Sequence, residues 1–399
     1  METQRRERLA LSGTVFAVLF AQVLLYPGVP QLVESLGGSG PLDAGTYFLA
    51  AEFAGFVLFA GLWGALSDAA GKRRPFIALG ALGGGLAYGL LAVLPEVPFW
   101  VVLVIRFVEG AFTIGAFSLA IATLMDLEGG NGRNMGAAGI AIGLGTGLGA
   151  PIGGQLYRLG PRAPLLAAAG LMVLVGVAAT QLRERGGAGD RSRALSALFT
   201  VRERPALAVP YAFGFADRFT AGFFALVGVV YFQTRYGLDA AGTGLLLGAF
   251  FLPFALLQYP LGVLSDRIGR VGPVAAGSFA YGIVIIAVSL TPTVALAALA
   301  MALVGAFGAL CAPATLALVN DLAAAGGRGT ATGGFNVVGS LGFLAGVVGG
   351  GALASRYGFE AAFLVAGGAE ILLAVALLPA LLNLDVERVA TFDSEESAD

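Results

Sequence analysis

Long apolar segments recur along this chain, and they restrict its fold more than any other feature. Each runs for about 20 residues, which as an α-helix is enough to cross a hydrocarbon core of ~30 Å. Of the 399 residues, 57% are hydrophobic and only 12% are charged, whereas a soluble domain carries about 25% charge. Because a backbone in lipid must satisfy its own hydrogen bonds, the sequence predicts an all-α membrane protein.

Twelve such segments are predicted, and they fall into two groups of six. The only long charged interruption follows the sixth segment. It divides the chain into an N-terminal six-helix bundle at 1–182, a cytoplasmic linker at 183–207, a C-terminal six-helix bundle at 208–383 and an acidic cytoplasmic tail at 384–399. The helices are expected at 9–30, 44–66, 75–94, 98–125, 134–157, 163–182, 208–232, 241–264, 272–290, 293–320, 330–354 and 359–383.

Basic residues gather in the loops on one side of these helices. If the N terminus is cytoplasmic, most arginines and lysines fall in cytoplasmic loops, as the positive-inside rule requires. The outer loops then hold only Arg158, Arg162, Arg235 and Arg356. The pattern predicts a multi-pass protein of the inner or plasma membrane with both termini in the cytoplasm.

Several chemistries are disfavoured by residue content. The chain has no histidine and one cysteine, Cys311, so neither a disulfide, a Cys/His metal site nor a histidine proton relay can form within it. Any proton carrier would therefore be a carboxylate. We found no phosphate-cradling loop, nucleophile elbow or zinc-protease motif, so an enzyme or receptor is the weakest interpretation. No cofactor, metal or nucleic-acid partner is expected.

Two loops repeat at a nearly constant interval. GALSDAAGKRR (64–74) follows the second predicted helix, and GVLSDRIGRVG (262–272) follows the eighth. Their aspartates, Asp68 and Asp266, lie 198 residues apart. An Asp and an Arg also bracket the loop after the fourth and the tenth helix, and these recur after 195 residues. The repetition predicts two similar halves, as in many secondary transporters.

These residues resemble a known family. Both loops are similar to the Gly-x-x-x-Asp-(Arg/Lys)-x-Gly-(Arg/Lys)-(Arg/Lys) signature of the major facilitator superfamily, and the resemblance covers nearly the whole chain; Ala69 departs from it. The resemblance implies two bundles about a pseudo-two-fold axis, with glycines that pack helices closely and aspartates that latch the inner gate. Loop anchoring at the membrane interface is the alternative. The implied gating residues are Gly64, Asp68, Gly71, Arg73, Arg133, Gly262, Asp266, Gly269, Arg270 and Arg328, with Arg133 and Arg328 as candidate partners of the aspartates.

The fifth predicted helix carries GLGTGLGAPIGGQLY (143–157). It is similar to the Gly-x-x-x-Gly-Pro-x-x-Gly-Gly signature of the drug/proton antiporter branch through Pro151, Gly153 and Gly154, although Thr146 and Ala150 replace two glycines. The resemblance implies export by antiport. Ordinary glycine-rich helix packing remains the alternative.

Ionisable residues inside the membrane are the best indicators of a site, because each costs at least a few kcal/mol and normally faces a cavity or a partner. Glu52 and Arg106 lie at similar depth in the second and fourth helices, and Glu109 shares a helix face with Arg106. Arg106 and Gly110 also match an Arg-x-x-x-Gly element that the resemblance associates with proton exchange. We expect Glu52, Arg106 and Glu109 to meet as a proton-coupling unit or a structural ion pair, with Asp217 as a second titrating site.

Weaker candidates complete the expected site. Glu370 lies in the twelfth helix, where a structural or lipid-edge role is expected because the family places that helix outside the cavity. Polar side chains in the first, eighth and eleventh helices are candidates for lining a substrate cavity. They are Gln22, Tyr26, Gln258 and Asn336.

The sequence therefore predicts a secondary active transporter that works by alternating access. The favoured function is proton-coupled efflux of a small amphipathic or lipophilic solute, by a protein active as a monomer in the lipid bilayer. The alternative is an uptake symporter or uniporter for a sugar, a carboxylate or another small metabolite. Fold alone does not decide between them.

Overall fold

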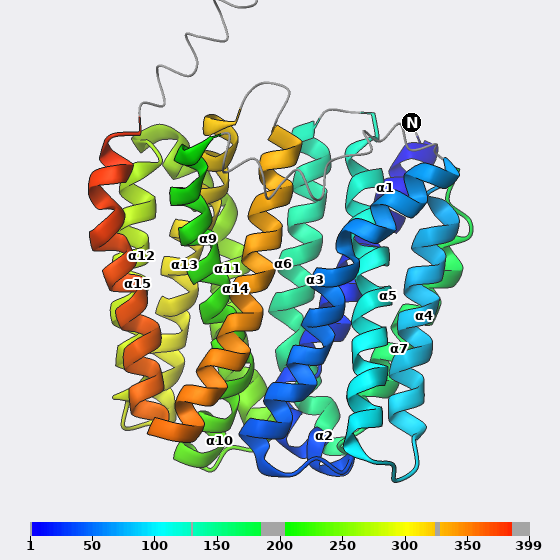
Figure 1. Ribbon diagram of the computed structural model, residues 1–399, viewed down its shortest axis with the longest axis horizontal. Coiled ribbons are helices and arrows are strands. Elements are labelled where there is room, and N and C mark those ends of the chain that lie inside the picture. The colour runs from blue at the N-terminus through cyan, green and yellow to red at the C-terminus, as the bar shows by residue number, and fades with distance from the viewer. Residues whose placement is uncertain (1, 129–130, 185–203, 324–327, 385–399) are drawn as a thin grey trace, which may run out of the picture.

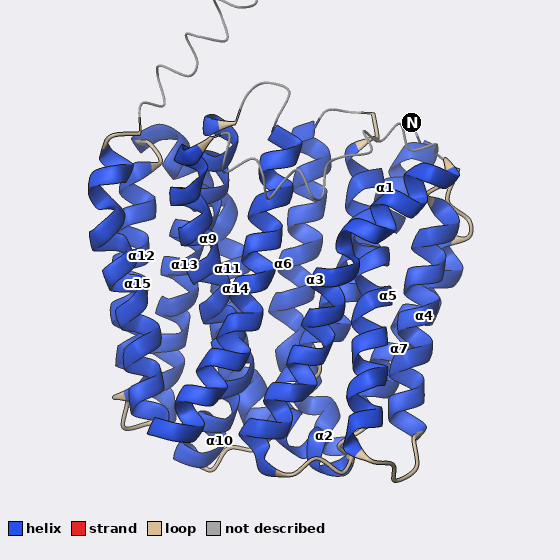
Figure 2. Ribbon diagram, viewed as in Figure 1, coloured by secondary structure: helices blue, strands red, loops and turns tan. Residues whose placement is uncertain are grey.

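The computed structural model describes residues 2–128, 131–184, 204–323 and 328–384, and every regular element in these ranges is helical (Figure 2). Eleven of the described helices are long and apolar enough to cross a membrane. A twelfth apolar helix, α7 (Ala163–Ala179), is shorter, at 17 residues or ~25 Å. The prediction of an all-α membrane protein is confirmed.

Most predicted spans agree with the observed helices to within a few residues. The remaining elements are α1 (Glu2–Val23), α2 (Val29–Ser35), α3 (Gly45–Ala70), α4 (Arg74–Val93), α5 (Phe99–Met125), α6 (Asn131–Leu156), α9 (Ala208–Phe223), α10 (Val229–Tyr236), α11 (Ala240–Ile268), α12 (Val271–Ser289), α13 (Val294–Leu322), α14 (Arg328–Tyr357) and α15 (Phe359–Leu382).

The first predicted span, 9–30, was wrong at both ends. Helix α1 ends at Val23, a tight turn covers Tyr26–Gly28, and α2 continues separately. Pro27 lies in that turn and Pro30 at the start of α2. Since proline lacks an N–H and fixes φ, it fits a turn or a helix start well, and in a helix interior it removes a backbone hydrogen bond. The two prolines explain why one helix became two.

The helices run side by side, with the start of α1 and the end of α15 at the same end of the molecule (Figure 1). Helix α3 packs on α5, α4 on α7 and α1 on α6; in the second group α11 packs on α13, α12 on α15 and α9 on α14. The same pairing therefore occurs twice. The two groups meet mainly along α6 and α11, and also along α3 and α14. Residues 185–203 and 385–399, most of the predicted linker and tail, lie outside the described ranges.

Glycines bring paired helices into backbone contact. A Cβ on Gly346 of α14 would lie 2.0 Å from the backbone oxygen of Phe219 in α9, and one on Gly153 of α6 would lie 2.1 Å from the oxygen of Leu24, the residue that follows α1. Neither space admits a methyl group. Close contacts recur every four residues, one turn apart, through Gly145, Gly149 and Gly153 in α6 and through Gly342, Gly346 and Gly350 in α14, where Gly350 meets side chains and not backbone.

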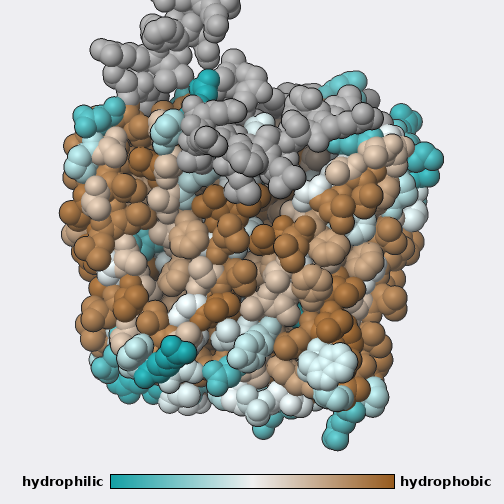
Figure 3. Space-filling view, viewed as in Figure 1, coloured by the Kyte–Doolittle hydropathy of each residue, from teal (hydrophilic) through white to brown (hydrophobic). Residues whose placement is uncertain are grey.

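The surface carries an apolar belt. Brown hydrophobic side chains cover the middle of the face in Figure 3, and teal hydrophilic side chains gather toward the two ends. Large apolar residues such as Leu86, Leu256 and Leu372 are 73%, 69% and 70% exposed. Exposed leucines at this density suit lipid rather than water. The belt is consistent with helices that cross the membrane roughly along their lengths.

We predict that Gly346→Ala lowers stability by about 1–3 kcal/mol, because the added methyl overpacks the α9–α14 contact. The matched control is Gly333→Ala in the same helix, where a Cβ meets nothing within 4 Å. Thermal unfolding of the purified protein in detergent should show a lower midpoint for the first variant only. Equal midpoints would mean that α9 and α14 do not depend on this contact.

Candidate functional site

The candidate site begins where α3 crosses α5. A Cβ on Gly110 would lie 2.1 Å from the backbone oxygen of Glu52, and one on Gly55 would lie 2.3 Å from that of Phe107. The helices touch through their backbones at this level. Arg106 is one turn before Gly110 on α5, so the contact brings its side chain within reach of Glu52.

Arg106 lies between two carboxylates. One terminal nitrogen of its guanidinium contacts Oε2 of Glu52, and the other donates to Oε2 of Glu109 at 2.6 Å. All three residues are 0% exposed. The two nitrogens of a rigid, planar guanidinium serve two acceptors at once, which a lysine could not reproduce. The structure thus brings together the three intramembrane charges that were expected to meet.

A third helix joins the cluster through Gln22 of α1. Its amide Nε2 donates to Oε1 of Glu52 at 2.8 Å, so both oxygens of Glu52 have a partner. The ring centroids of Phe48 and Tyr88 lie 4.6 and 5.5 Å from the Arg106 guanidinium carbon, and both rings are buried. These aromatic faces stabilise the cation. Neither ring was predicted, because only contacts between helices reveal them.

The cluster holds one more acid than base. With both carboxylates ionised, Glu52, Arg106 and Glu109 carry a net charge of −1; one added proton makes them neutral. An uncompensated buried charge is strongly unfavourable. Oε1 of Glu109 has no hydrogen-bond partner among the described residues, so it is a free oxygen to which a proton could add. The arrangement can bind one proton, and it can equally tie α1, α3 and α5 together.

The other predicted site residues are scattered. Tyr26 is buried, with its ring centroid 6.2 Å from that of Phe343 in the second helix group. Asn336 is exposed on α14 and Gln258 partly exposed on α11, and neither side chain hydrogen-bonds to another described residue. Asp217 is buried in α9, and one carboxylate oxygen lies 3.8 Å from Nε of Arg218.

The two helix groups are joined at the end away from the N terminus. Phe53 and Phe343 stack with centroids 3.9 Å apart, Gln31 donates to Gln233 at 2.9 Å, and Ser355 donates to Asp43. Among the described residues, no hydrogen bond joins the groups at the opposite end. The molecule is therefore in a conformation closed at the α2 and α10 end.

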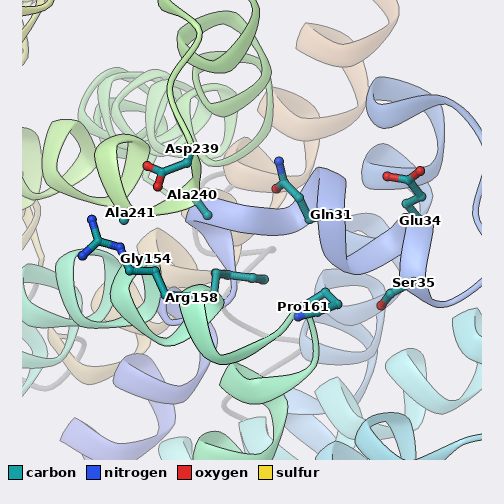
Figure 4. Close-up of a pocket in the computed structure, with 10 residues that line it drawn as sticks. Gln31, Glu34, Ser35, Gly154, Arg158, Pro161, Asp239, Ala240 and Ala241 are labelled. Carbon is teal, nitrogen blue, oxygen red and sulfur yellow. The ribbon is translucent and has the colours of Figure 1, made fainter.

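A pocket of about 480 Å³ lies at this closed end (Figure 4). It is lined by Gln31 and Glu34 of α2, by Arg158 in the short 3-10 helix Tyr157–Leu159 after α6, and by Asp239 before α11. It contains none of the expected cavity residues. The pocket is therefore separate from the intramembrane charges of Glu52, Arg106 and Glu109.

The glycines of the repeated loops do not act as the resemblance implied. A Cβ on Gly64 meets nothing within 4 Å, and one on Gly262 makes only an ordinary contact at 3.6 Å. The expectation of close helix packing there was wrong for this conformation. Gly71 and Gly269 have φ of +63° and +90° where α3 and α11 end. Glycine is favoured at such positive φ because it has no Cβ.

The loop arginines pair within their own helix group. Arg73 contacts Asp126 at the end of α5, and Arg270 contacts both Asp266 and Asp321, the latter at 3.2 Å at the end of α13. The arginines of the two signature loops thus form ion pairs with acids of their own helix group. Asp68 has no ion pair with a described residue. The expected partners Arg133 and Arg328 have side chains outside the described part, so those pairings stay predictions.

Comparison with known proteins agrees with this architecture. The model of the Major Facilitator Superfamily matches residues 11–230 and 211–398. Solved structures of the nucleoside transporter NupG and of a D-xylose–proton symporter match with TM-scores of 0.76 and 0.74 at 14% and 15% identity. They cover 94% and 93% of this chain and 99% and 96% of their own, which supports the fold alone. The chain belongs to the Major Facilitator Superfamily.

Relatives found by sequence similarity are more informative about the branch of the family than the solved structures are. A class G tetracycline resistance protein of Vibrio anguillarum is 31% identical over 54% of this chain and 56% of its own length. A class C tetracycline resistance protein of Escherichia coli is 28% identical over 67% and 70%. An uncharacterized transporter of Methanocaldococcus jannaschii is 30% identical over 46% of this chain and 49% of its own. The chain thus spans about half the length of two of these relatives.

We predict that Arg106→Lys destabilises the protein although it keeps the charge. The ammonium of a lysine is one compact group without the fixed fork of the guanidinium, so we expect it to hold only one of the two carboxylates, and the loss of the other contact costs about 3–5 kcal/mol. The matched control is Arg158→Lys, at an exposed arginine outside the cluster. Thermal unfolding in detergent should separate the two variants. An unchanged midpoint for Arg106→Lys would show that the cluster does not hold α1, α3 and α5 together.

Proposed function

We propose that this protein is a proton-coupled exporter of a small amphipathic or lipophilic solute that works by alternating access. The observation that carries the proposal is the buried cluster of two carboxylates around one guanidinium. Glu52, Arg106 and Glu109 have room for one proton that neutralises them. No other fully buried group of described residues combines a cation with two acids.

The proposal includes the orientation of the protein in the membrane and a role for each part of the chain. The end of the molecule where α1 begins and α15 ends is also the end with the basic loops. By the positive-inside rule we infer that this end, with both termini, faces the cytoplasm of an inner or plasma membrane. The closed end is then the outer one, and the conformation faces inward. Residues 1–182 and 208–383 act as two bundles that rock against each other, with 183–207 and 384–399 as cytoplasmic linker and tail.

Movement between the bundles would use the glycine face of α6. Its Gly154 meets the backbone of α11, where an added Cβ would lie 2.6 Å from the oxygen of Ala240. Pro151 packs on Gly248 of the same helix. The antiporter-like motif thus lies partly against α1 and partly against the opposite bundle. A smooth contact of small residues permits sliding with little change in packing.

The direction and substrate class rest on sequence relatives. Two of them are named for resistance to tetracycline, an amphipathic compound, and a membrane transporter gives resistance when it removes such a compound from the cell. The nucleoside and sugar transporters are similar in fold only. Export therefore has support from sequence that uptake lacks, and uptake is the outcome that the following experiment would reveal.

The proposal predicts the direction of driven transport. Reconstituted vesicles with an imposed pH gradient should move labelled tetracycline toward the acidic compartment by antiport, whereas symport would move a solute toward the alkaline one. Protein-free vesicles measure passive partition. A panel with xylose and a nucleoside tests the uptake alternative. Accumulation of a sugar or nucleoside on the alkaline side, without tetracycline movement, would contradict export.

The same assay tests the cluster. Glu52→Gln and Glu109→Gln each remove one acid and leave Arg106 with a single carboxylate, so the remaining site is neutral without a proton. We expect at least one variant to lose the pH-driven component while facilitated equilibration persists. The control is Glu360→Gln, at an exposed acid outside the cluster. If both cluster variants keep the wild-type pH dependence, the cluster is a structural ion pair.

A further inference from the structure

A second buried acid lies in the other helix group, and the mechanism above does not use it. Glu370 of α15 is 3% exposed. Its neighbourhood is set by the α12–α15 crossing, where a Cβ on Gly282 would lie 2.5 Å from the backbone oxygen of Gly367. Glu370 is about one turn from that contact, and Oε2 accepts a hydrogen bond from Ser278 of α12 at 2.6 Å. Of the two roles expected for Glu370, the lipid-edge one is therefore wrong, and the structural one stays a prediction.

Three buried oxygens around Glu370 have no hydrogen-bond partner among the described residues. They are Oε1 of Glu370, the hydroxyl of Thr220 in α9 and the hydroxyl of Tyr281 in α12. Thr220 and Tyr281 are 0% and 2% exposed, and the Thr220 hydroxyl lies close to both other groups. Buried polar atoms without partners are unfavourable. Three such oxygens from three helices are enough hydrogen-bond partners for one internal water.

The charges near Glu370 leave its carboxyl without a cation. The ionisable groups that face it are Asp217 of α9, Tyr281 of α12 and Cys311 of α13, none of which is cationic at neutral pH. Arg218 contacts Asp217 and is half exposed. A carboxylate that is buried without a cation is unfavourable unless a proton or a metal ion neutralises it. Three oxygens are too few to replace the usual shell of an ion that prefers six or more.

We propose that Glu370 holds the proton of a second buried site, in which one internal water joins its carboxyl to Thr220 and Tyr281. Asp217 exchanges that proton with solvent. Asp217 is 9% exposed and lies one turn before Thr220 on α9, so it lies between the buried site and solvent. The site is independent of the Arg106 cluster, and it gives each helix group a proton-binding carboxyl.

Infrared spectroscopy of the reconstituted full chain tests the proposal, because a protonated carboxyl has its own C=O band that shifts in D2O. Glu370→Gln should remove one component of that band at neutral pH. The control Glu360→Gln, at an exposed acid, should leave the band unchanged. Loss of the component in Glu370→Gln together with an intact component in Glu52→Gln and Glu109→Gln separates this site from the Arg106 cluster. A band unchanged by Glu370→Gln overturns the proposal.

Two further variants test the water and the exchange route even if Glu370→Gln does not fold. Thr220→Val removes a hydroxyl at nearly constant volume and should shift the Glu370 component to higher frequency. Asp217→Asn should keep the component but slow its exchange in D2O. An unshifted component in Thr220→Val contradicts the water bridge, and unchanged exchange in Asp217→Asn contradicts the route. Loss of the component on adding sodium, but not choline, would identify a cation site instead.

Discussion

Close contact between helix backbones is the constraint on which the rest of this structure depends. Lipid offers no hydrophobic drive for one apolar helix to join another, so association relies on van der Waals packing and on polar contacts between helices. Glycines supply the packing: those of α6 and α14 meet the backbones of α1 and α9 at successive turns. A side chain at Gly346 or Gly153 would separate the helices, and the polar groups between them would then lose their partners.

The buried charges depend on the same contacts. Gly110 lies against the backbone of Glu52, and only this approach allows one guanidinium to reach acids on two helices. The buried Arg106 is stabilised inside the membrane because two carboxylates and two aromatic faces surround its guanidinium. Because there are two carboxylates and only one guanidinium, one carboxylate can bind a proton. In this protein the same helix contact therefore sets both the packing and the proposed coupling chemistry.

The two helix groups repeat in packing but not in chemistry. Gly305 of α13 meets the backbone of Phe250 in α11, as Gly110 meets that of Glu52. Counting back by the repeat, Met301 and Val304 stand where Arg106 and Glu109 stand in the first group, and both are buried. The second group keeps the backbone contact and replaces the charges with apolar side chains. Its own buried acids, Asp217 and Glu370, lie on other helices, which is why the repeat alone could not indicate them.

The class of fold, the twelve apolar helices and the meeting of the three charges could be predicted from the amino-acid sequence, because segment length, hydropathy and depth along a helix are local properties. The sequence could not determine that Pro27 and Pro30 divide the first helix, since proline also occurs within membrane helices. Nor could it assign Arg73 to Asp126, or Ser278 to Glu370. Those partners lie on different helices, and their distances depend on how the glycine contacts set helix crossing and rotation, which only the tertiary structure decides.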